Sequence, residues 1–79
     1  MNTDNNWVSS RKQLPPEMKD NLQWSEDVYI KIGNWFSKTI RKGYYDYFLE
    51  QWFCVSKNDM YQPVPKIKNV FWTNEPPQQ

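Results

Sequence analysis

The chain has a single cysteine, Cys54, and no histidine. An intramolecular disulfide therefore cannot form, and the usual zinc sites built from cysteine and histidine are excluded. A domain of fewer than about 80 residues seldom obtains more than a few kcal/mol from its core alone, and this chain has 79 residues. Dense apolar packing, or association with another chain, is then the remaining source of stability.

Aromatic residues can supply that packing. They make up 18% of the sequence, with five Trp, five Tyr and four Phe. Such side chains bury large apolar areas, so a disordered chain is not expected over most of the length. We expect one folded domain over residues 7–73, a flexible polar tail at residues 1–6 and a proline-rich tail at residues 74–79.

Neither hydropathy nor charge points to a membrane or to nucleic acid. No segment approaches the roughly 20 consecutive apolar residues of a membrane span, and no basic start leads into the apolar stretch of a signal peptide. We therefore expect a cytoplasmic protein with no membrane partner. Ten basic and nine acidic residues give a formal net charge of +1, which provides no global attraction to anionic polymers or surfaces.

The clearest strand signal is the segment VYIKI at residues 28–32, where apolar and polar side chains alternate. The Gly33-Asn34 pair that follows predicts a two-residue hairpin turn, because Gly adopts the positive φ of primed turns. The returning strand is expected at residues 35–42. Gly43 is expected to mark a bulge or a bend.

Two structures compete for residues 44–53, YYDYFLEQWF. Periodicity favours a helix, because aromatic and apolar side chains recur along one helical stripe. Composition favours strands, because aromatic residues are abundant and good helix formers are few. We favour a hairpin and keep the helix as the alternative. A last short strand is expected at residues 68–73.

The expected fold is mainly β: an antiparallel meander of about four or five strands over a Trp-rich core. One short helix is an option near Met18, where Met18 and Leu22 are spaced i, i+4 on a common face. With that helix the fold would be a β-rich α+β domain.

A set of spaced aromatic, glycine and proline residues extends from Trp7 to Pro77. It comprises an early Trp followed by Leu-Pro, a central Gly with an aromatic pair, a mid-chain Trp and a closing Trp near a proline-rich end. The matching residues are Trp7, Leu14, Pro15, Gly43, Tyr44, Tyr45, Asp46, Trp52, Trp72, Pro76 and Pro77. In this order they resemble domain-of-unknown-function family 551, small proteins of phages, prophages and gut-bacterial mobile elements.

The resemblance implies a small β-rich domain and favours strands over residues 44–53. It carries no catalytic group. The chain departs from the family near its end, where members often have a His before the last Trp and Leu-Pro after it. Here Phe71 precedes Trp72 and Asn74-Glu75 follows, so a role of that His cannot be transferred.

One binding candidate is a basic and aromatic stretch with no acidic residue. Basic side chains contact phosphates and aromatic faces stack on bases, so the pattern predicts a nucleotide or single-strand binding face. The commoner alternative is a solvated strand face with its aromatic residues in the core. The stretch contains Lys31, Lys38, Arg41 and Lys42 beside Trp35, Phe36, Tyr44 and Tyr45.

Exposed tryptophans are a second binding candidate, because Trp is enriched where partners bind. Trp24 and Trp35 are chosen since neither lies on an alternating apolar face. More often, tryptophans in a small domain simply fill the core. The candidate binding residues from both arguments are Trp24, Trp35, Lys38, Arg41, Lys42 and Tyr45.

Catalytic candidates are few. Without histidine, Ser-His-Asp and Cys-His arrangements cannot be formed. Glu26 and Asp27 would point to opposite faces of a strand, and Asp46 and Glu50 would converge only on a helix. Cys54 has no activating base next to it in the sequence and is expected to be a small buried hydrophobe. With only two glycines, no phosphate-cradling loop can be formed. We expect no enzyme, no cofactor and no metal.

The expected function is therefore that of a non-enzymatic binding protein, encoded by a phage or mobile element, that acts by binding a host protein. Inhibition of a host defence system is a form suggested only by the genomes that the family inhabits. The alternative is a nucleotide or small-ligand sequestering protein, with homo-oligomers as an option. A carboxylate-dependent enzyme is the remote alternative.

Overall fold

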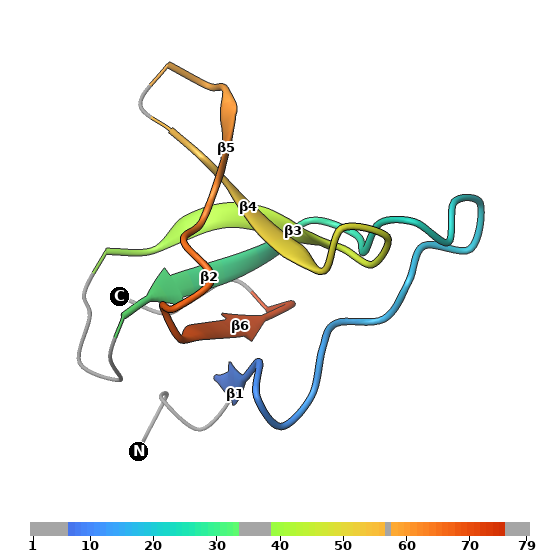
Figure 1. Ribbon diagram of the computed structural model, residues 1–79, viewed down its shortest axis with the longest axis horizontal. Coiled ribbons are helices and arrows are strands. Elements are labelled where there is room, and N and C mark those ends of the chain that lie inside the picture. The colour runs from blue at the N-terminus through green and yellow to red at the C-terminus, as the bar shows by residue number, and fades with distance from the viewer. Residues whose placement is uncertain (1–6, 34–38, 57, 76–79) are drawn as a thin grey trace.

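The computed structural model describes residues 7–33, 39–56 and 58–75. In these ranges the chain forms six strands and no helix (Figure 1). All paired strands are antiparallel and belong to one sheet, with the order β1-β6-β2-β3-β4-β5. The strands are β1 (Val8–Ser9), β2 (Val28–Ile32), β3 (Arg41–Asp46), β4 (Gln51–Val55), β5 (Tyr61–Pro63) and β6 (Val70–Thr73).

The predicted mainly β class is confirmed, and the strand order adds one feature to the predicted meander. Strands β2 to β5 follow one another as a meander, but β6 returns to pair with the free edge of β2. Val8 of β1 and Ile30 of β2 are both paired with Trp72. The last strand, β6, is therefore internal and lies between β1 and β2 (Figure 1).

The optional helix near Met18 does not form. The amide of Met18 instead donates to the carbonyl of Trp24 at 2.9 Å, next to a bridge between Glu17 and Ser25. No helix in the described ranges is long and apolar enough to span a membrane. Of the predicted tails, only Asn74 and Glu75 fall within the described residues, and both are exposed.

The connection between β2 and β3 is longer than the two-residue turn predicted at Gly33-Asn34. A turn there would pair Ile30 with residue 37, whereas Ile30 is paired with Arg41. Gly33 has a φ of 108°, and its amide donates to the carbonyl of Asn69 at 2.8 Å. The end of β2 is thus bonded toward β6 instead of turning into β3. Most of the strand predicted at residues 35–42 lies outside the described residues.

The hairpin predicted over residues 44–53 is confirmed. Strands β3 and β4 pair with Tyr45 opposite Trp52, and residues 47–50 form the turn. Glu50 closes this turn with a φ of 53°, a left-handed conformation that is uncommon for a residue other than Gly. The helical spacing of the aromatic residues arises because the turn divides them between two strands.

The core lies on one face of the sheet. Loop residues cover it: Pro15 is fully buried, the indole N–H of Trp72 donates to the carbonyl of Gln13 at 2.8 Å, and the hydroxyl of Tyr47 donates to the carbonyl of Pro15. Buried hydrophobic residues from four strands and one loop meet there. They are Val28, Ile30, Tyr45, Trp52, Val64, Val70 and Trp72.

Gly43 lies in the middle of β3, paired on both sides with Val28 and Cys54, and does not form the predicted bulge or bend. A Cβ atom there would lie 2.4 Å from the carbonyl oxygen of Phe53 and 2.9 Å from Cδ1 of Ile30. Only glycine therefore fits at position 43, because the backbone of β4 lies too close for a Cβ atom.

A bulge lies just beyond this position, on the β2 side. Val28 pairs with Gly43, and the next bridge joins Trp24 to Asp46, so residues 25–27 face only residues 44–45. Ser25 fills the gap: its amide donates to the carbonyl of Tyr45, and its hydroxyl accepts the amide of Tyr45, both at 2.9 Å. The bulge places Trp24 beside the end of β3.

Candidate functional site

The basic and aromatic residues predicted to form one binding face are divided by the sheet. Arg41 is half-buried and donates to the carbonyl of Val55 at 3.4 Å. Lys42 is exposed and points to the opposite face, as strand alternation requires. Tyr45 is buried in the core with 9% exposure. Trp35 and Lys38 lie outside the described residues. Of the described residues in this set, Lys31, Lys42 and Tyr44 share the face opposite the core, whereas Arg41 and Tyr45 lie on the core face.

Trp24 is the predicted binding residue that is both exposed and held in place. Its side chain is 37% exposed, and its indole N–H donates to Oδ2 of Asp46 at 3.1 Å. This agrees with the choice of Trp24 as an exposed tryptophan. Trp7 is half-buried, and the ammonium of Lys31 lies 4.5 Å from the centre of its ring.

Asp46 is the central polar group at this end of the sheet. It is 3% exposed, yet its carboxylate accepts four hydrogen bonds. Oδ1 accepts the amides of Phe48 and Leu49 at 2.9 Å, and Oδ2 accepts Nε2 of Gln23 as well as Trp24 at 3.1 Å. Burial alone would raise the pKa of Asp46, but these four hydrogen bonds favour the charged form and hold the pKa below its usual value.

These contacts assign Asp46 a different role from the acid/base pairing with Glu50 considered above. Both carboxylate oxygens are occupied by N–H donors, and Glu50 is exposed at the far end of the turn. An acidic side chain that accepts amides two and three residues later is typical of a turn that stabilises its own backbone. The aspartate directly before residues 47–50 was the sequence signal for this role.

The turn held by Asp46 displays two large apolar side chains. Phe48 is 74% exposed and Leu49 is 57% exposed, and we call this pair the hydrophobic tip. A further hydrogen bond, from the amide of Tyr47 to the carbonyl of Gln23 at 2.6 Å, ties the turn to the neighbouring segment. The backbone of the tip is thus fixed, while its side chains contribute little to the core.

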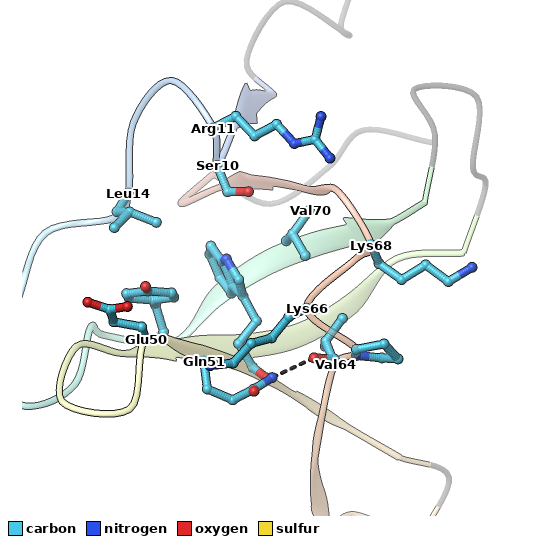
Figure 2. A pocket seen from close by; sticks show the side chains of 12 residues that line it. Ser10, Arg11, Leu14, Glu50, Gln51, Val64, Lys66, Lys68 and Val70 are labelled. Atoms are coloured by element: carbon cyan, nitrogen blue, oxygen red, sulfur yellow. Dashed lines mark hydrogen bonds between the residues drawn. The ribbon is translucent and has the colours of Figure 1, made fainter.

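A second surface feature is a pocket of about 360 Å³ on the core side, which we call the basic pocket (Figure 2). The buried rings of Tyr45 and Trp52 belong to its lining. Figure 2 shows Lys68 and Glu50 on opposite sides of the pocket, with Arg11 above them. The full lining is Ser10, Arg11, Leu14, Tyr45, Glu50, Gln51, Trp52, Val64, Pro65, Lys66, Lys68 and Val70.

The rim of the basic pocket has an excess of positive charge. Arg11, Lys66 and Lys68 outnumber the single carboxylate, Glu50. Lys66 Nζ lies 3.5 Å from the carbonyl oxygen of Leu49, which links this rim to the hydrophobic tip. Three cations around an apolar floor can attract a small anion with an aromatic or aliphatic body.

Sequence reasoning missed these rim residues, because Arg11 and residues 66–68 are far apart along the chain and only the fold brings them together. Within the ranges that the structure describes, no group of three His, Cys, Asp or Glu side chains could hold a metal ion. Cys54 is half-buried and packs against the core.

Comparison of the chain with protein-family models, with curated proteins and with solved structures gave no match. The resemblance to domain-of-unknown-function family 551 thus stays a prediction based on the spacing of aromatic, glycine and proline residues.

Proposed function

We propose that the chain is a non-enzymatic protein-binding domain that inserts the hydrophobic tip into an apolar cleft of a partner protein. The observation that carries this proposal is that Phe48 and Leu49 are 74% and 57% exposed on a turn whose backbone Asp46 fixes. Large apolar side chains that are exposed side by side on a small domain can mark a protein–protein interaction site. Following the resemblance described above, the partner is a host protein, and inhibition of host defence is one form of the activity.

The fixed turn favours tight binding. Ordering a flexible loop upon association reduces the free energy of binding, so an anchor held before the encounter binds more tightly. Here the carboxylate of Asp46 already orders the amides of Phe48 and Leu49. Full burial of two such side chains yields about 3–6 kcal/mol of apolar transfer free energy, which is enough to dominate a small interface.

A protein cleft fits the tip better than a lipid surface does. Charge does not decide between the two, because the exposed carboxylate of Glu50 follows the tip and Lys66 Nζ lies 3.5 Å from the carbonyl oxygen of Leu49. Stable attachment to a membrane needs more apolar area than two side chains provide. Burial of the tip in a protein cleft of matching shape does not need that larger apolar area.

The test is photocrosslinking from the tip. A photoreactive phenylalanine analogue at position 48 is expected to crosslink to one protein in bacterial cells, and the same analogue at position 67 is not. Ile67 is the matched control, because it is 85% exposed and lies on a different loop. Equal crosslinking from both positions, or none from position 48, would overturn the proposal.

The crosslinked protein is then purified and its affinity measured. We expect the double variant Phe48→Ser, Leu49→Ser to bind it at least about thirtyfold more weakly, since a central apolar anchor contributes about 2 kcal/mol or more. The variant Ile67→Ser is expected to bind normally. Unfolding curves should be unchanged in both variants, because none of the three side chains is buried. A double variant that binds as well as the wild type would show that the contact is incidental.

A second candidate function is capture of a small anion in the basic pocket, favoured by the three cations around its apolar floor. Adenosine monophosphate and inorganic phosphate serve as probes in calorimetric titrations. The variant Lys66→Gln, Lys68→Gln should lose binding, whereas Lys42→Gln, on the other face of the sheet, should retain it. No heat with either probe, or equal binding by both variants, would exclude this function.

A further inference from the structure

The face of the sheet opposite the core contains a pocket of about 270 Å³, which we call the aromatic pocket. Its residues come from the segment before β2, from the bulge, from β3 and from β5, so the folded sheet is needed to assemble it. The lining is Met18, Trp24, Ser25, Asp27, Tyr44 and Tyr61. None of the six had been assigned to a common site by sequence reasoning.

Three aromatic rings of the aromatic pocket are steeply inclined to one another. The centres of the Tyr44 and Tyr61 rings are 5.0 Å apart with an angle of 62° between their planes. The Trp24 and Tyr44 rings are 6.5 Å apart at 72°. These are edge-to-face contacts, in which the rings touch and form adjoining walls. Because all three rings line one pocket, a cation that enters it lies next to more than one aromatic ring, and cation–π attraction acts where the cation faces a ring within about 6 Å of its centre.

The walls are held in place without a ligand. The indole N–H of Trp24 is bonded to Asp46, and the hydroxyl of Tyr61 donates to Oδ2 of Asp27 at 3.1 Å. Phe53 stacks against Tyr44 with ring centres 5.3 Å apart and an angle of 17°. Each ring therefore has a contact that fixes its orientation, so little ordering is needed when a ligand enters.

The formal charge of the lining is negative. Asp27 is the charged residue among the six, and no Lys or Arg belongs to the lining. Burial raises the pKa of Tyr61, and the charge of Asp27 raises it further. The same two causes act on the pKa of Tyr44, together with the charge of Asp46. The negative charges that disfavour ionisation of the two tyrosines would attract a cation in the same pocket.

We propose that the aromatic pocket binds an alkylated ammonium group through cation–π contacts with Trp24, Tyr44 and Tyr61 and through attraction to Asp27. A bare ammonium is strongly hydrated. In this lining Asp27 already accepts the hydroxyl of Tyr61, and the hydroxyl of Ser25 is bonded to the amide of Tyr45 and the carbonyl of Glu26, so few acceptors are free to replace its water. Alkyl groups remove that hydration, spread the charge and pack against the rings. The inference does not rest on the proposed role of the hydrophobic tip, which is a different surface.

The shared chemistry of an alkylated ammonium has two sources, a methylated lysine side chain and a free quaternary amine. Both are tested by titration followed through the indole N–H signal of Trp24 in two-dimensional NMR. The probes are tetramethylammonium, the Nα-acetyl methylamide of Nε-trimethyl-lysine, the same derivative of unmodified lysine, and a neutral isostere with carbon in place of the quaternary nitrogen.

We expect both quaternary probes to shift the Trp24 signal and to bind roughly three- to thirtyfold more tightly than the neutral isostere. Tighter binding of the trimethyl-lysine derivative than of tetramethylammonium would assign the site to a protein side chain, and the reverse order to a free amine. Equal binding of the neutral isostere would overturn the proposal, because the pocket would then be merely apolar. Absence of any shift with the quaternary probes would overturn it too.

Three variants test the ring of Tyr61, the hydroxyl of Tyr61 and the charge of Asp27 separately. Tyr61→Leu removes one wall and should weaken trimethyl-lysine binding roughly three- to thirtyfold, while Tyr61→Phe keeps the ring and should retain most of it. Asp27→Asn should weaken binding and reduce its dependence on salt. Tyr61 and Asp27 are exposed, so these variants are expected to fold, which amide spectra would verify. Unchanged affinity in both Tyr61→Leu and Asp27→Asn would refute the proposal.

Discussion

The indole N–H of Trp24 and the amide of Leu49 donate to the two oxygens of one buried carboxylate, that of Asp46, at 3.1 and 2.9 Å. Trp24 is a wall of the aromatic pocket, and Leu49 is half of the hydrophobic tip. A single side chain therefore orders parts of both proposed binding surfaces. A change at Asp46 should disturb both surfaces at once.

Substitution of Asp46 tests its structural role. In Asp46→Asn, the amide oxygen can still accept from Phe48 and Leu49, but the amino group then faces two other donors, Gln23 and Trp24. We expect a loss of roughly 2–4 kcal/mol in the free energy of unfolding, because buried donors are left unsatisfied. Urea titration measures it.

The control for this substitution is Asp59→Asn. Asp59 is also an aspartate, but it is exposed, and its positive φ of 60° is a conformation that Asn tolerates. Its stability should stay within about 0.5 kcal/mol of the wild type. Similar stabilities of the two variants would contradict a structural role for the Asp46 hydrogen bonds.

The carboxylate of Asp46 also makes the stability of the fold depend on pH. The pKa of Asp46 lies below its usual 3.8 in the folded chain, so the folded state favours the charged form more than the unfolded state does. The resulting stability is complete above the pKa of the unfolded chain and is lost as the pH falls through the lower, folded value. We expect the stability difference between wild type and Asp46→Asn to shrink from about pH 4 downward.

Urea titrations of both proteins at a series of pH values measure this difference. The variant lacks the titrating group of Asp46. Subtracting its stability at each pH from that of the wild type therefore isolates the contribution of Asp46 from those of the other carboxylates. A difference that stays constant, or that grows in acid, would show that the folded chain does not hold Asp46 in its charged form.

Local patterns predicted the parts of the fold in which neighbouring residues pair. Alternation located β2, and aromatic composition located the β3–β4 hairpin, because both signals depend on burial of one strand face. The β2–β3 register was missed because the Gly33 amide bonds to Asn69, which is distant in the sequence. The return of β6 to the β2 edge is equally non-local, and no local pattern encodes it.

The candidate sites show the same difference between local and non-local features. Exposure of Trp24 was predicted because it lies outside any alternating apolar face, a local property. The aromatic pocket was not predicted, since it needs Tyr61 of β5 to reach over β4 and β3 to Asp27 beside β2. Arg41 and Lys42 are adjacent in β3 and lie on opposite faces of the sheet, as strand alternation alone predicts.

Gly43 allows a further test of packing within the sheet. Gly43→Ala would place a Cβ atom 2.4 Å from the backbone oxygen of Phe53, which cannot move without breaking the β3–β4 pairing. We expect a loss of about 1–3 kcal/mol, the usual cost of overpacking. Thermal unfolding measures it, as a lowered Tm.

Gly33→Ala serves as the comparison for Gly43→Ala. Its Cβ atom would meet no atom within 4 Å, so only the φ of 108° disfavours it. The expected cost is about 1–2 kcal/mol from backbone strain. Gly43→Ala should also lower hydrogen-exchange protection along β3 and β4, whereas Gly33→Ala should not. Full protection of β3 and β4 in Gly43→Ala would contradict the close approach.

The loop that covers the core is attached by two side-chain hydrogen bonds, from Trp72 to the carbonyl of Gln13 and from Tyr47 to that of Pro15. Trp72→Phe removes the first bond and some buried volume, and Tyr47→Phe removes the second bond alone. We expect losses of about 2–3 kcal/mol and about 1 kcal/mol, respectively. Amide exchange of residues 10–14 should accelerate in both variants, because the loop then opens without unfolding of the sheet. If residues 10–14 instead exchange only as fast as the whole domain unfolds, the loop and the sheet open as one unit.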